Sequence, residues 1–223
     1  MRFSYANSIR EDFPELVTGV LCIEGITASG NVSETTAKFQ ELARDRLESG
    51  TESTLPEVQA WRRTFARMEL KPTQYRCASE ALLRRFRKDN ALPSIHPLVD
   101  LCNSISIAFA VPIAAFDLQR VSGDLEVRRA NGGEIYENFG GEVEHPEVGE
   151  VIFADSSERA HARRWTNRQS GHSAVRDGTT NALIVSEAMH DTAVEDMARL
   201  IAAIKAAVMQ TWPSASAVEW PSR

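Results

Sequence analysis

Three polar side chains, Asp100, Asn103 and Asp117, stand among apolar residues between positions 92 and 117. Carboxylates and amides are the groups with which proteins accept protons, orient water and hold polar ligands. The alternative role is structural, because an aspartate also caps a helix or a turn through its side-chain oxygens. A shared chemical role requires that the fold bring the three side chains to one place.

A helix followed by a strand is expected to position these residues. Pro93 and Pro97 restrict the chain before the helix, and a proline fits the first helical position because its missing N–H needs no partner there. Apolar residues then recur every three or four positions, which predicts one buried face. Pro112 ends the helix, and residues 112–117 are predicted to form a strand. This order predicts that the three polar side chains lie close together.

Helices are predicted on the amino-terminal side of this stretch. Ser33 is a suitable cap, and the apolar residues after it recur at helical spacing. The predicted helices span residues 33–49, 56–69 and 79–88. The apolar run at 13–26, which contains Glu24, is predicted to be a buried strand before them.

Strands are predicted on the carboxyl-terminal side. Residues 125–130 alternate between apolar and polar, and the turn signal at 131–133 predicts that residues 134–139 return as their partner. Further strands are predicted at 150–156, 162–169 and 181–188. An amphipathic helix is predicted at 192–211, and the chain after residue 213 is expected to be frayed.

These elements predict one α+β domain over residues 1–212, with a mixed, mostly antiparallel sheet and packed helices. It comprises a helical segment (27–90), the central motif (92–117), the sheet (118–190) and the last helix (192–211), followed by a tail at 213–223. The central helix is expected to cover a pocket, and the last helix to close the other side. A chain of 223 residues with 43% hydrophobic residues can bury one full core.

The composition argues against a secreted, membrane-spanning or metal-binding protein. No segment approaches the roughly 20 apolar residues of a membrane helix, and the first residues lack the pattern of a secretion leader. Cys22, Cys77 and Cys102 lie far apart in apolar patterns, which favours neither disulfides nor a zinc site. Motifs for dinucleotides, phosphate loops, serine esterases and paired zinc histidines are missing from the sequence. We therefore expect a cytoplasmic protein without metal or cofactor.

Charge is distributed unevenly along the chain. The net charge of −6 argues against a protein that coats nucleic acid non-specifically. Lysines and arginines nevertheless gather in residues 62–88 and again in residues 159–168. Two interpretations stay open: solvated helix faces, or a patch for an RNA backbone.

The central stretch resembles the tRNA-editing domain of the phenylalanyl-tRNA synthetase beta subunit. That family carries a hydrophobic-Val-Asp run, then an asparagine, a helix and Pro-x-x-Ala-Phe-Asp. The matching residues are Val99, Asp100, Asn103, Pro112, Ala115, Phe116 and Asp117. Ala114 stands where the family carries a histidine. We expect no synthetase core beside this domain, so the chain is similar to freestanding relatives, some of which hydrolyse mischarged tRNA in trans.

The resemblance implies an aminoacyl-tRNA deacylase acting on mischarged tRNA. The ester is already activated, so hydrolysis mainly requires a held water and a positioned carbonyl. Oriented amides then stabilise the developing oxyanion, and either a carboxylate or a terminal ribose hydroxyl orients the water. Asp117 and Asn103 are the candidate catalytic residues. The alanine at position 114 departs from the family and suggests a substrate other than the tyrosine that the synthetase domain removes.

Acidic residues point to the substrate of such a site. Glu24, Asp100, Asp117 and Glu187 are expected to form one acidic pocket, which suits a cationic or polar amino acid. Freestanding relatives of the domain include a deacylase for arginine tRNA charged with canavanine, and the acidic residues are compatible with that substrate. Further candidates for substrate binding are Ser104, Arg168 and Gln169, and for tRNA binding Arg76, Arg84 and Arg164.

Two other interpretations remain open. The domain could bind tRNA or a free amino acid without hydrolysing anything, which the alanine at position 114 permits. It could also be an unrelated small-molecule hydrolase with Asp117 as its base. The candidate site residues have structural alternatives too: Asp100 and Asn103 could brace the loop before the helix, and residues 164–169 could be an exposed edge strand.

Overall fold

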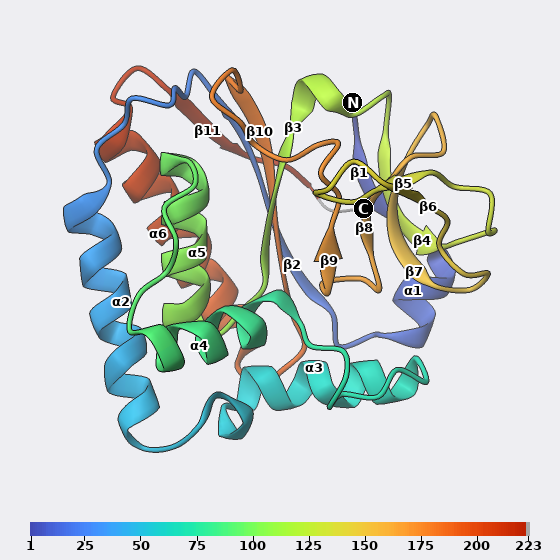
Figure 1. Ribbon diagram of the computed structural model, residues 1–223, viewed down its shortest axis with the longest axis horizontal. Helices are drawn as coiled ribbons and strands as arrows, with labels where there is room; N and C mark the ends of the chain where they lie inside the picture. Colours follow the sequence, from blue (N-terminus) through green and yellow to red (C-terminus); the bar gives the residue numbers. More distant parts are fainter. Residues whose placement is uncertain (222–223) are drawn as a thin grey trace.

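The computed structural model describes residues 1–221 and shows two β-sheets side by side, with helices covering one of them (Figure 1). The covered sheet has four strands in the order β11-β2-β10-β3, each antiparallel to its neighbours. Its strands are β2 (Val17–Glu24), β3 (Ile113–Asp117), β10 (Asn181–Ala188) and β11 (Ser216–Glu219). The central strand β10 therefore connects β3 to the rest of the sheet.

The second sheet has five strands in the order β1-β4-β7-β8-β9. Its strands are β1 (Phe3–Tyr5), β4 (Leu125–Arg129), β7 (Val151–Asp155), β8 (Ala160–Arg163) and β9 (Arg168–Gln169). Only β1 and β4 run parallel, and the other neighbours are antiparallel. A short hairpin of β5 (Tyr136–Glu137) and β6 (Val143–Glu144) stands beside this sheet. The structure confirms a single α+β domain with mixed, mostly antiparallel pairing.

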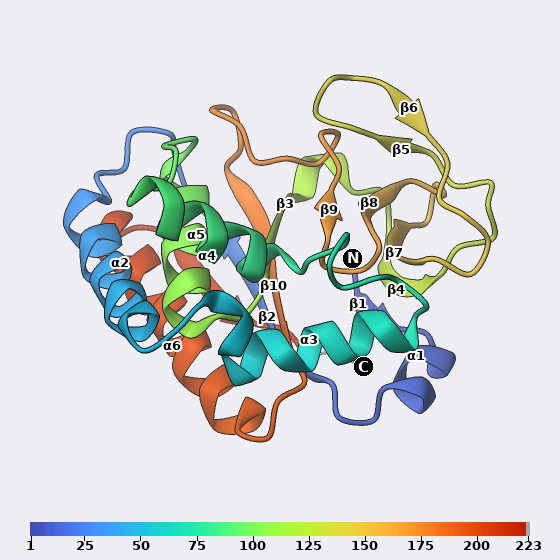
Figure 2. The ribbon, with the colours of Figure 1, turned by 60° about the horizontal axis from the view of Figure 1, so that its bottom comes forward.

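Six α-helices complete the domain within residues 1–221. They are α1 (Asn7–Asp12), α2 (Ser33–Glu48), α3 (Pro56–Arg67), α4 (Ala78–Asp89), α5 (Pro97–Phe109) and α6 (Ala193–Thr211), and two single 3₁₀ turns are η1 (Glu52–Thr54) and η2 (Leu118–Arg120). Figure 1 shows α2, α4, α5 and α6 on the side of the four-stranded sheet. In Figure 2, α3 lies across the lower end of both sheets. The predicted helices are confirmed to within a few residues.

The central helix begins and ends where the prolines predict. Pro97 occupies its first turn, and the ring of His96 caps it, because Nδ1 accepts the N–H of Leu98 at 3.1 Å. Ala110, with φ of 56°, ends the helix in the left-handed region. Pro112 follows at once, and the chain continues as β3. One short connection therefore leads from α5 into the sheet.

Two apolar cores hold the layers together. Leu101 and Ile105 of α5 pack with Leu200 of α6 against the four-stranded sheet. Phe116 of β3 packs with Phe153 of β7 in the second core, which joins the two sheets. Aromatic residues of α3 belong to this second core, so the helix stabilises both sheets at once. None of the helices within residues 1–221 has the length and apolar character needed to cross a membrane.

Three expectations about the strands are wrong. Residues 134–139 do not pair with β4, which lies between β1 and β7; instead β5 pairs with β6. Residues 162–169 are not one strand, because Arg164 and Trp165 adopt φ of 47° and 58° and form a turn between β8 and β9. The chain after residue 213 is not frayed over Ser216–Glu219, which pair with β2 as an edge strand.

Candidate functional site

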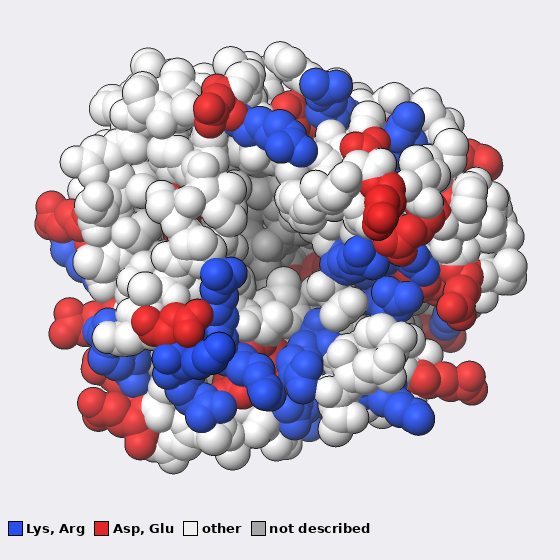
Figure 3. Space-filling view, in the orientation of Figure 1, with Lys and Arg blue, Asp and Glu red and all other residues white. Residues whose placement is uncertain are grey.

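A pocket opens between the two sheets, in the hollow that Figure 3 shows between the helical and the strand side of the molecule. One wall comes from β3 and β10, and the other from β7, β8 and the turn into β9. The lining residues are Ala78, Pro112, Ile113, Ala114, Phe153, Ala162, Trp165, Thr166, Asn167, Arg168, Gln169, Val185 and Glu187. We call this space the inter-sheet pocket.

Small residues keep the inter-sheet pocket open. Ala114 of β3 stands opposite Val185 of β10 in the antiparallel ladder, and Ala162 of β8 stands opposite Phe153 of β7. The alanine methyl groups leave space between the two sheets that larger side chains would fill. The walls are therefore apolar, and polar groups enter the pocket at a few positions.

Glu187 is the buried carboxyl of the inter-sheet pocket. Only 2% of the residue is exposed. Its Oε1 accepts two hydrogen bonds, from the Tyr5 hydroxyl at 2.6 Å and from Trp165 Nε1 at 2.7 Å. Its Oε2 accepts none from the residues that the structure describes. Burial raises the pKa of Glu187 to about 7, although the two hydrogen bonds to its carboxylate act to lower the pKa. This carboxyl therefore changes charge near neutral pH.

Two aromatic residues hold the carboxyl in place. Tyr5 comes from β1, at the start of the chain, and its hydroxyl also accepts a hydrogen bond from Thr18 at 3.1 Å. Trp165 is fully buried in the turn after β8, edge-on to Trp61 of α3 with ring centroids 5.3 Å apart. Because both donors are fixed by packing, the position of Oε1 is fixed as well.

The hairpin that carries Arg168 and Gln169 forms the outer wall. Gln169 Nε2 donates to the carbonyl oxygen of Ala115 at 2.7 Å, which ties β9 to β3 across the pocket. Arg168 contacts Glu144 of β6 at 3.2 Å. Arg164 lies on the other side of the turn, with its guanidinium 4.9 Å from the ring centre of Tyr75. Of these three residues, Arg168 and Gln169 line the pocket.

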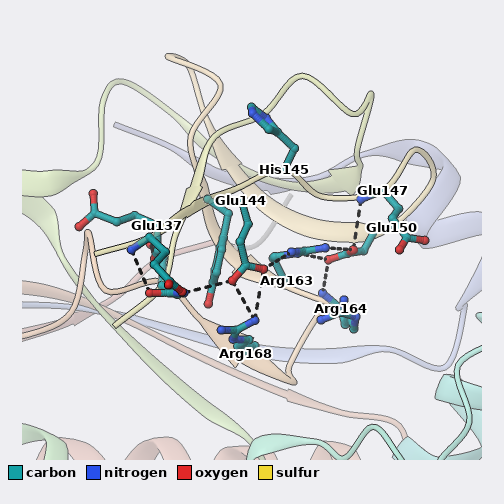
Figure 4. Close-up of polar contacts among 12 residues, drawn as sticks. Glu137, Glu144, His145, Glu147, Glu150, Arg163, Arg164 and Arg168 are labelled. Carbon is teal, nitrogen blue, oxygen red and sulfur yellow. Dashed lines mark hydrogen bonds and ion pairs between the residues drawn. The ribbon is translucent and has the colours of Figure 1, made fainter. Parts of the chain in front are cut away.

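A network of ion pairs holds this hairpin (Figure 4). Arg163, at the end of β8, is 4% exposed and contacts Glu150 at 2.8 Å and Glu144 at 2.7 Å. Burial opposes the ionisation of Glu150, but the hydrogen bonds from Arg163 hold the pKa of this carboxyl below its ordinary value. The network therefore supports the wall from behind and leaves Arg168 at the edge of the pocket.

The four acidic residues that were expected to form one pocket do not lie together. Asp100 accepts hydrogen bonds from Ser94 Oγ and Ile95 N, at 2.7 and 2.8 Å, and braces the loop before α5. Asp117 lines a separate cavity, where it accepts the Thr179 hydroxyl at 2.8 Å. Glu24 is exposed at the end of β2, which leaves only Glu187 in the inter-sheet pocket. The sequence pattern places each of these carboxylates on an element but cannot tell which cavity each one faces.

Ser104 of α5 does not line the cavity of Asp117 either. Ser104 is buried and accepts a hydrogen bond from Gln40 of α2 at 3.4 Å. Ser104 and Asp100 line a cavity between α2 and α5, while Asp117 faces the loop at residues 171–179. Asn103 is half-buried on α5. The catalytic roles of Asp117 and Asn103 stay predictions.

The predicted tRNA contacts also differ in their surroundings. Arg76 is half-buried and shares Glu80, itself 1% exposed, with Arg62. Arg84 is exposed on α4 and lies within 4.0 Å of no carboxylate of residues 1–221. Figure 3 shows lysine and arginine side chains gathered along the lower rim of the hollow.

Tyr5 and Trp165 are site residues that sequence reasoning missed. Tyr5 lies 182 positions before the carboxyl that it contacts, and no local pattern connects the two. Trp165 lies in a segment whose sequence predicts a strand. In the structure its backbone is left-handed, and the indole points inward. No signal in a single sequence identifies such a donor pair.

One group of side chains has the composition of a metal site. Ligand atoms of Glu57, His190 and Asp196 lie within 4.8 Å of one another. Both carboxylates already have cationic partners, because Arg46 contacts Glu57 at 2.7 Å and Arg199 contacts Asp196. Since a metal ion would have to displace these guanidinium groups, we interpret the group as a structural network.

A second buried series consists of Ser173, His161 and Asp155. Ser173 Oγ lies 2.8 Å from His161 Nδ1, and Asp155 Oδ2 lies 3.2 Å from Nε2. Ser173 and His161 are fully buried, so a substrate cannot reach the serine oxygen. Burial opposes ionisation of Asp155, but hydrogen bonds from His161 and from backbone N–H groups lower the pKa of this carboxyl. The series therefore joins β8 to the loop after β9.

Sequence comparison assigns the chain to a domain family. The family model of the B3/4 domain matches residues 60–210, which is more than half of the chain. The protein belongs to the B3/4 domain family, and the resemblance found in the central stretch is confirmed at this level.

The curated relatives are phenylalanine–tRNA ligase beta subunits. That of Shewanella oneidensis is 32% identical over 116 residues, which cover 52% of this chain and 14% of the relative. That of Methylococcus capsulatus is 42% identical over 53 residues, or 24% of this chain and 7% of the relative. This chain therefore spans only a small part of the length of these proteins.

A solved structure shares the fold over almost the whole chain. It is an N-terminal fragment of the phenylalanyl-tRNA synthetase beta subunit from Pyrococcus horikoshii. The TM-score is 0.54 at 10% sequence identity, and the match covers 99% of this chain and 54% of the fragment. At this identity the likeness concerns the fold alone.

Proposed function

We propose that this protein is a deacylase that hydrolyses the ester of a mischarged aminoacyl-tRNA in trans, in the cytoplasm. The amino-acid end of the tRNA enters the inter-sheet pocket, and the side chain of the amino acid points to Glu187. Membership of the B3/4 family and the relation to synthetase beta subunits support a tRNA substrate. The observation that carries the proposal is the buried carboxyl with one unoccupied oxygen in this pocket.

The chemistry of Glu187 favours a cationic side chain. Its Oε1 is occupied by Tyr5 and Trp165, so Oε2 is the atom that can accept a donor from a ligand. A cation beside a carboxyl with a raised pKa favours the ionised form and gains a charge-assisted hydrogen bond in an apolar cavity. Arginine and its analogue canavanine carry such groups. Canavanyl-tRNA for arginine is therefore the substrate that we propose.

Catalysis in this pocket does not rely on a histidine at position 114. Ala114 lines the pocket, and an activated ester needs mainly a positioned carbonyl and a held water. Amide groups at the rim, among them Gln169, supply oriented dipoles for the developing oxyanion. Asp117 lines another cavity and neither it nor Asn103 lines this pocket, so their catalytic roles rest on the sequence resemblance alone, and Asp117→Asn tests the first of them.

Deacylation of a panel of charged tRNAs tests the proposal. The panel contains arginyl- and canavanyl-tRNA for arginine and tyrosyl-tRNA for phenylalanine, with wild type, Glu187→Gln, Asp117→Asn and Glu34→Gln. Glutamine keeps the acceptor for Tyr5 and Trp165, so this variant should fold. We expect release from canavanyl-tRNA, reduced at least about tenfold in kcat/KM by Glu187→Gln. Glu34 lies exposed on α2, and its variant should match wild type.

The outcomes separate the proposed function from its alternatives. Equal activity of wild type and Glu187→Gln on canavanyl-tRNA would remove Glu187 from recognition. Unchanged activity of Asp117→Asn would remove Asp117 from catalysis. Binding of charged tRNA without any release would favour a binding module, and hydrolysis of small esters alone would favour an unrelated hydrolase.

A further inference from the structure

We propose that the outer face of α4, together with the arginine pair at its start, is a docking surface for the phosphate backbone of the tRNA acceptor stem. This inference rests on the proposed function, because it names the surface that would hold the substrate while its end occupies the inter-sheet pocket. Four residues define the surface, which we call the α4 track: Arg62, Arg76, Arg84 and Lys88.

The α4 track starts at the pocket and leads away from it. Ala78, the first residue of α4, lines the inter-sheet pocket, and its N–H donates to the carbonyl of Thr166 at 2.8 Å. At a rise of about 1.5 Å per residue, Arg84 and Lys88 lie about 9 and 15 Å further along the helix axis. Their spacing of four residues places both side chains on one face. A nucleic acid whose end enters the pocket thus meets this face next.

The outer part of the track carries charge that the protein does not neutralise. Arg84 and Lys88 are exposed, and neither lies within 4.0 Å of a carboxylate in the part of the chain that the structure describes. Their neighbours differ, because Arg85 contacts Asp89 at 3.7 Å and Arg87 contacts Glu52 at 2.8 Å. Two unpaired cations on one face attract a polyanion.

The inner part of the track carries a second excess charge. Glu80 is almost completely buried, and two guanidinium groups share its carboxylate: Arg62 at 2.5 Å and Arg76 at 3.5 Å. Two cations on one anion leave one positive charge. This charge lies beside the pocket, since Asn167, which lines it, donates to the carbonyl oxygen of Arg76 at 2.7 Å.

The charge of the whole chain makes the track distinctive. The net charge is −6, yet the lower rim of the hollow in Figure 3 is lined with lysine and arginine side chains. On an acidic protein, a local positive surface attracts a polyanion to that surface only, because the protein as a whole repels it. Continuity with the pocket favours the backbone of the same tRNA over an acidic protein.

Salt-dependent binding of uncharged tRNA tests the track. The variant Arg84→Glu/Lys88→Glu is compared with Arg2→Glu/Lys38→Glu, which changes the net charge equally at two exposed, ion-paired cations outside α4. Filter binding is measured across a series of KCl concentrations. We expect the α4 variant to weaken binding at least about tenfold and to reduce the slope of log K against log [salt] by about 2. The control should keep the wild-type slope.

Hydrolysis of a minimal ester, aminoacyl-adenosine, distinguishes failure of the docking surface from failure of the proposed catalytic function. If the α4 variant cleaves this ester as wild type does but loses activity on full tRNA, the track is supported. If wild type binds tRNA through α4 but hydrolyses no ester, docking stands and the proposed function fails. Equal affinity and equal salt slope in the α4 variant and wild type would overturn the track, as would the absence of tRNA binding by wild type.

Discussion

At the scale of single residues, the inter-sheet pocket is defined by one carboxyl that the fold keeps out of water. Glu187 lies in a central strand, between an apolar wall and two aromatic donors. Its two oxygens have different roles, because Oε1 accepts two hydrogen bonds while Oε2 accepts none from residues 1–221. Such a group binds a ligand donor without first losing a protein partner, which favours recognition.

The raised pKa of Glu187 makes stability depend on pH in a defined direction. The ordinary value is 4.5 and the value in the fold is about 7, so between these values the folded state binds a proton that the unfolded state has lost. Stability relative to Glu187→Gln is therefore greatest below pH 4.5 and falls as pH rises to about 7, by about 3 kcal/mol in total. Urea unfolding of both proteins from pH 4 to 8 measures this difference.

The exposed carboxyl of Glu34 supplies the comparison. Its side chain is 79% exposed on α2, and Lys38 lowers the pKa of this carboxyl. The stability of wild type relative to Glu34→Gln should therefore rise slightly with pH near pH 4.5, opposite in direction to the effect of Glu187. A constant difference between wild type and Glu187→Gln at every pH would contradict the assigned titration. An increase of relative stability with pH would contradict its direction.

Part of this site was predictable at the residue scale. Glu187, Arg168 and Gln169 were expected to bind substrate, and all three line the inter-sheet pocket. Asp100 and Asp117 match the family pattern equally well but face other cavities. The reason is that the pattern identifies the element of each residue, α5 for Asp100 and β3 for Asp117, but not the cavity that the element borders at that position.

At the scale of elements, α4 connects the pocket to the basic surface. The helix is anchored by Glu80, which points inward and accepts both Arg62 of α3 and Arg76 of the preceding loop. Its apolar residues Leu83 and Phe86 pack inward as well. The remaining face is free to carry the exposed cations.

Removal of the Glu80 charge should loosen this anchor. Glu80→Gln leaves two guanidinium groups without their carboxylate, and we expect a loss of about 2–3 kcal/mol in the free energy of unfolding. This loss is smaller than is usual for a broken buried ion pair, because about a third of the Arg62 and Arg76 side chains remains exposed to solvent. Denaturant unfolding monitored by circular dichroism gives the midpoint and the slope.

Glu34→Gln again provides the matched control, since it removes an exposed pair with Lys38 at 2.8 Å. Exposed pairs of this spacing contribute little to stability, because solvent screens their attraction. Equal losses in the two variants would show that the buried carboxylate does not anchor α4. A loss confined to Glu80→Gln would support the anchor.

Element types were easier to predict than element partners. The apolar periodicity of α5 and α6 and the proline positions around α5 depend on neighbouring residues, and the structure confirms them. The partners of β4 and β11 depend on residues far away in the chain: β4 lies between β1 and β7, and β11 covers the edge of β2. A turn signal such as the one at 131–133 indicates a change of direction but not the strand that the chain meets next.

At the scale of the whole molecule, the two sheets share one apolar core. Phe116 of β3 belongs to the four-stranded sheet, yet its ring contacts Phe153 of the five-stranded sheet with centroids 5.4 Å apart. Trp61 of α3 joins the same core from the end of both sheets. The inter-sheet pocket therefore depends on the packing of the whole domain.

Truncation of Phe116 tests whether the two sheets unfold cooperatively. The side chain is fully buried, so Phe116→Ala should lower the free energy of unfolding by about 3–5 kcal/mol through lost burial and a cavity. Because the core is shared, both sheets should unfold together in wild type and variant. Circular dichroism should give the same transition as tryptophan fluorescence, which reports all four tryptophans, among them Trp61 and Trp165 of the second core. Phe139→Ala, at a residue 69% exposed, should change stability by less than about 0.5 kcal/mol.

Two separate transitions in wild type would show that the sheets are independent and that the pocket lies between units that move apart.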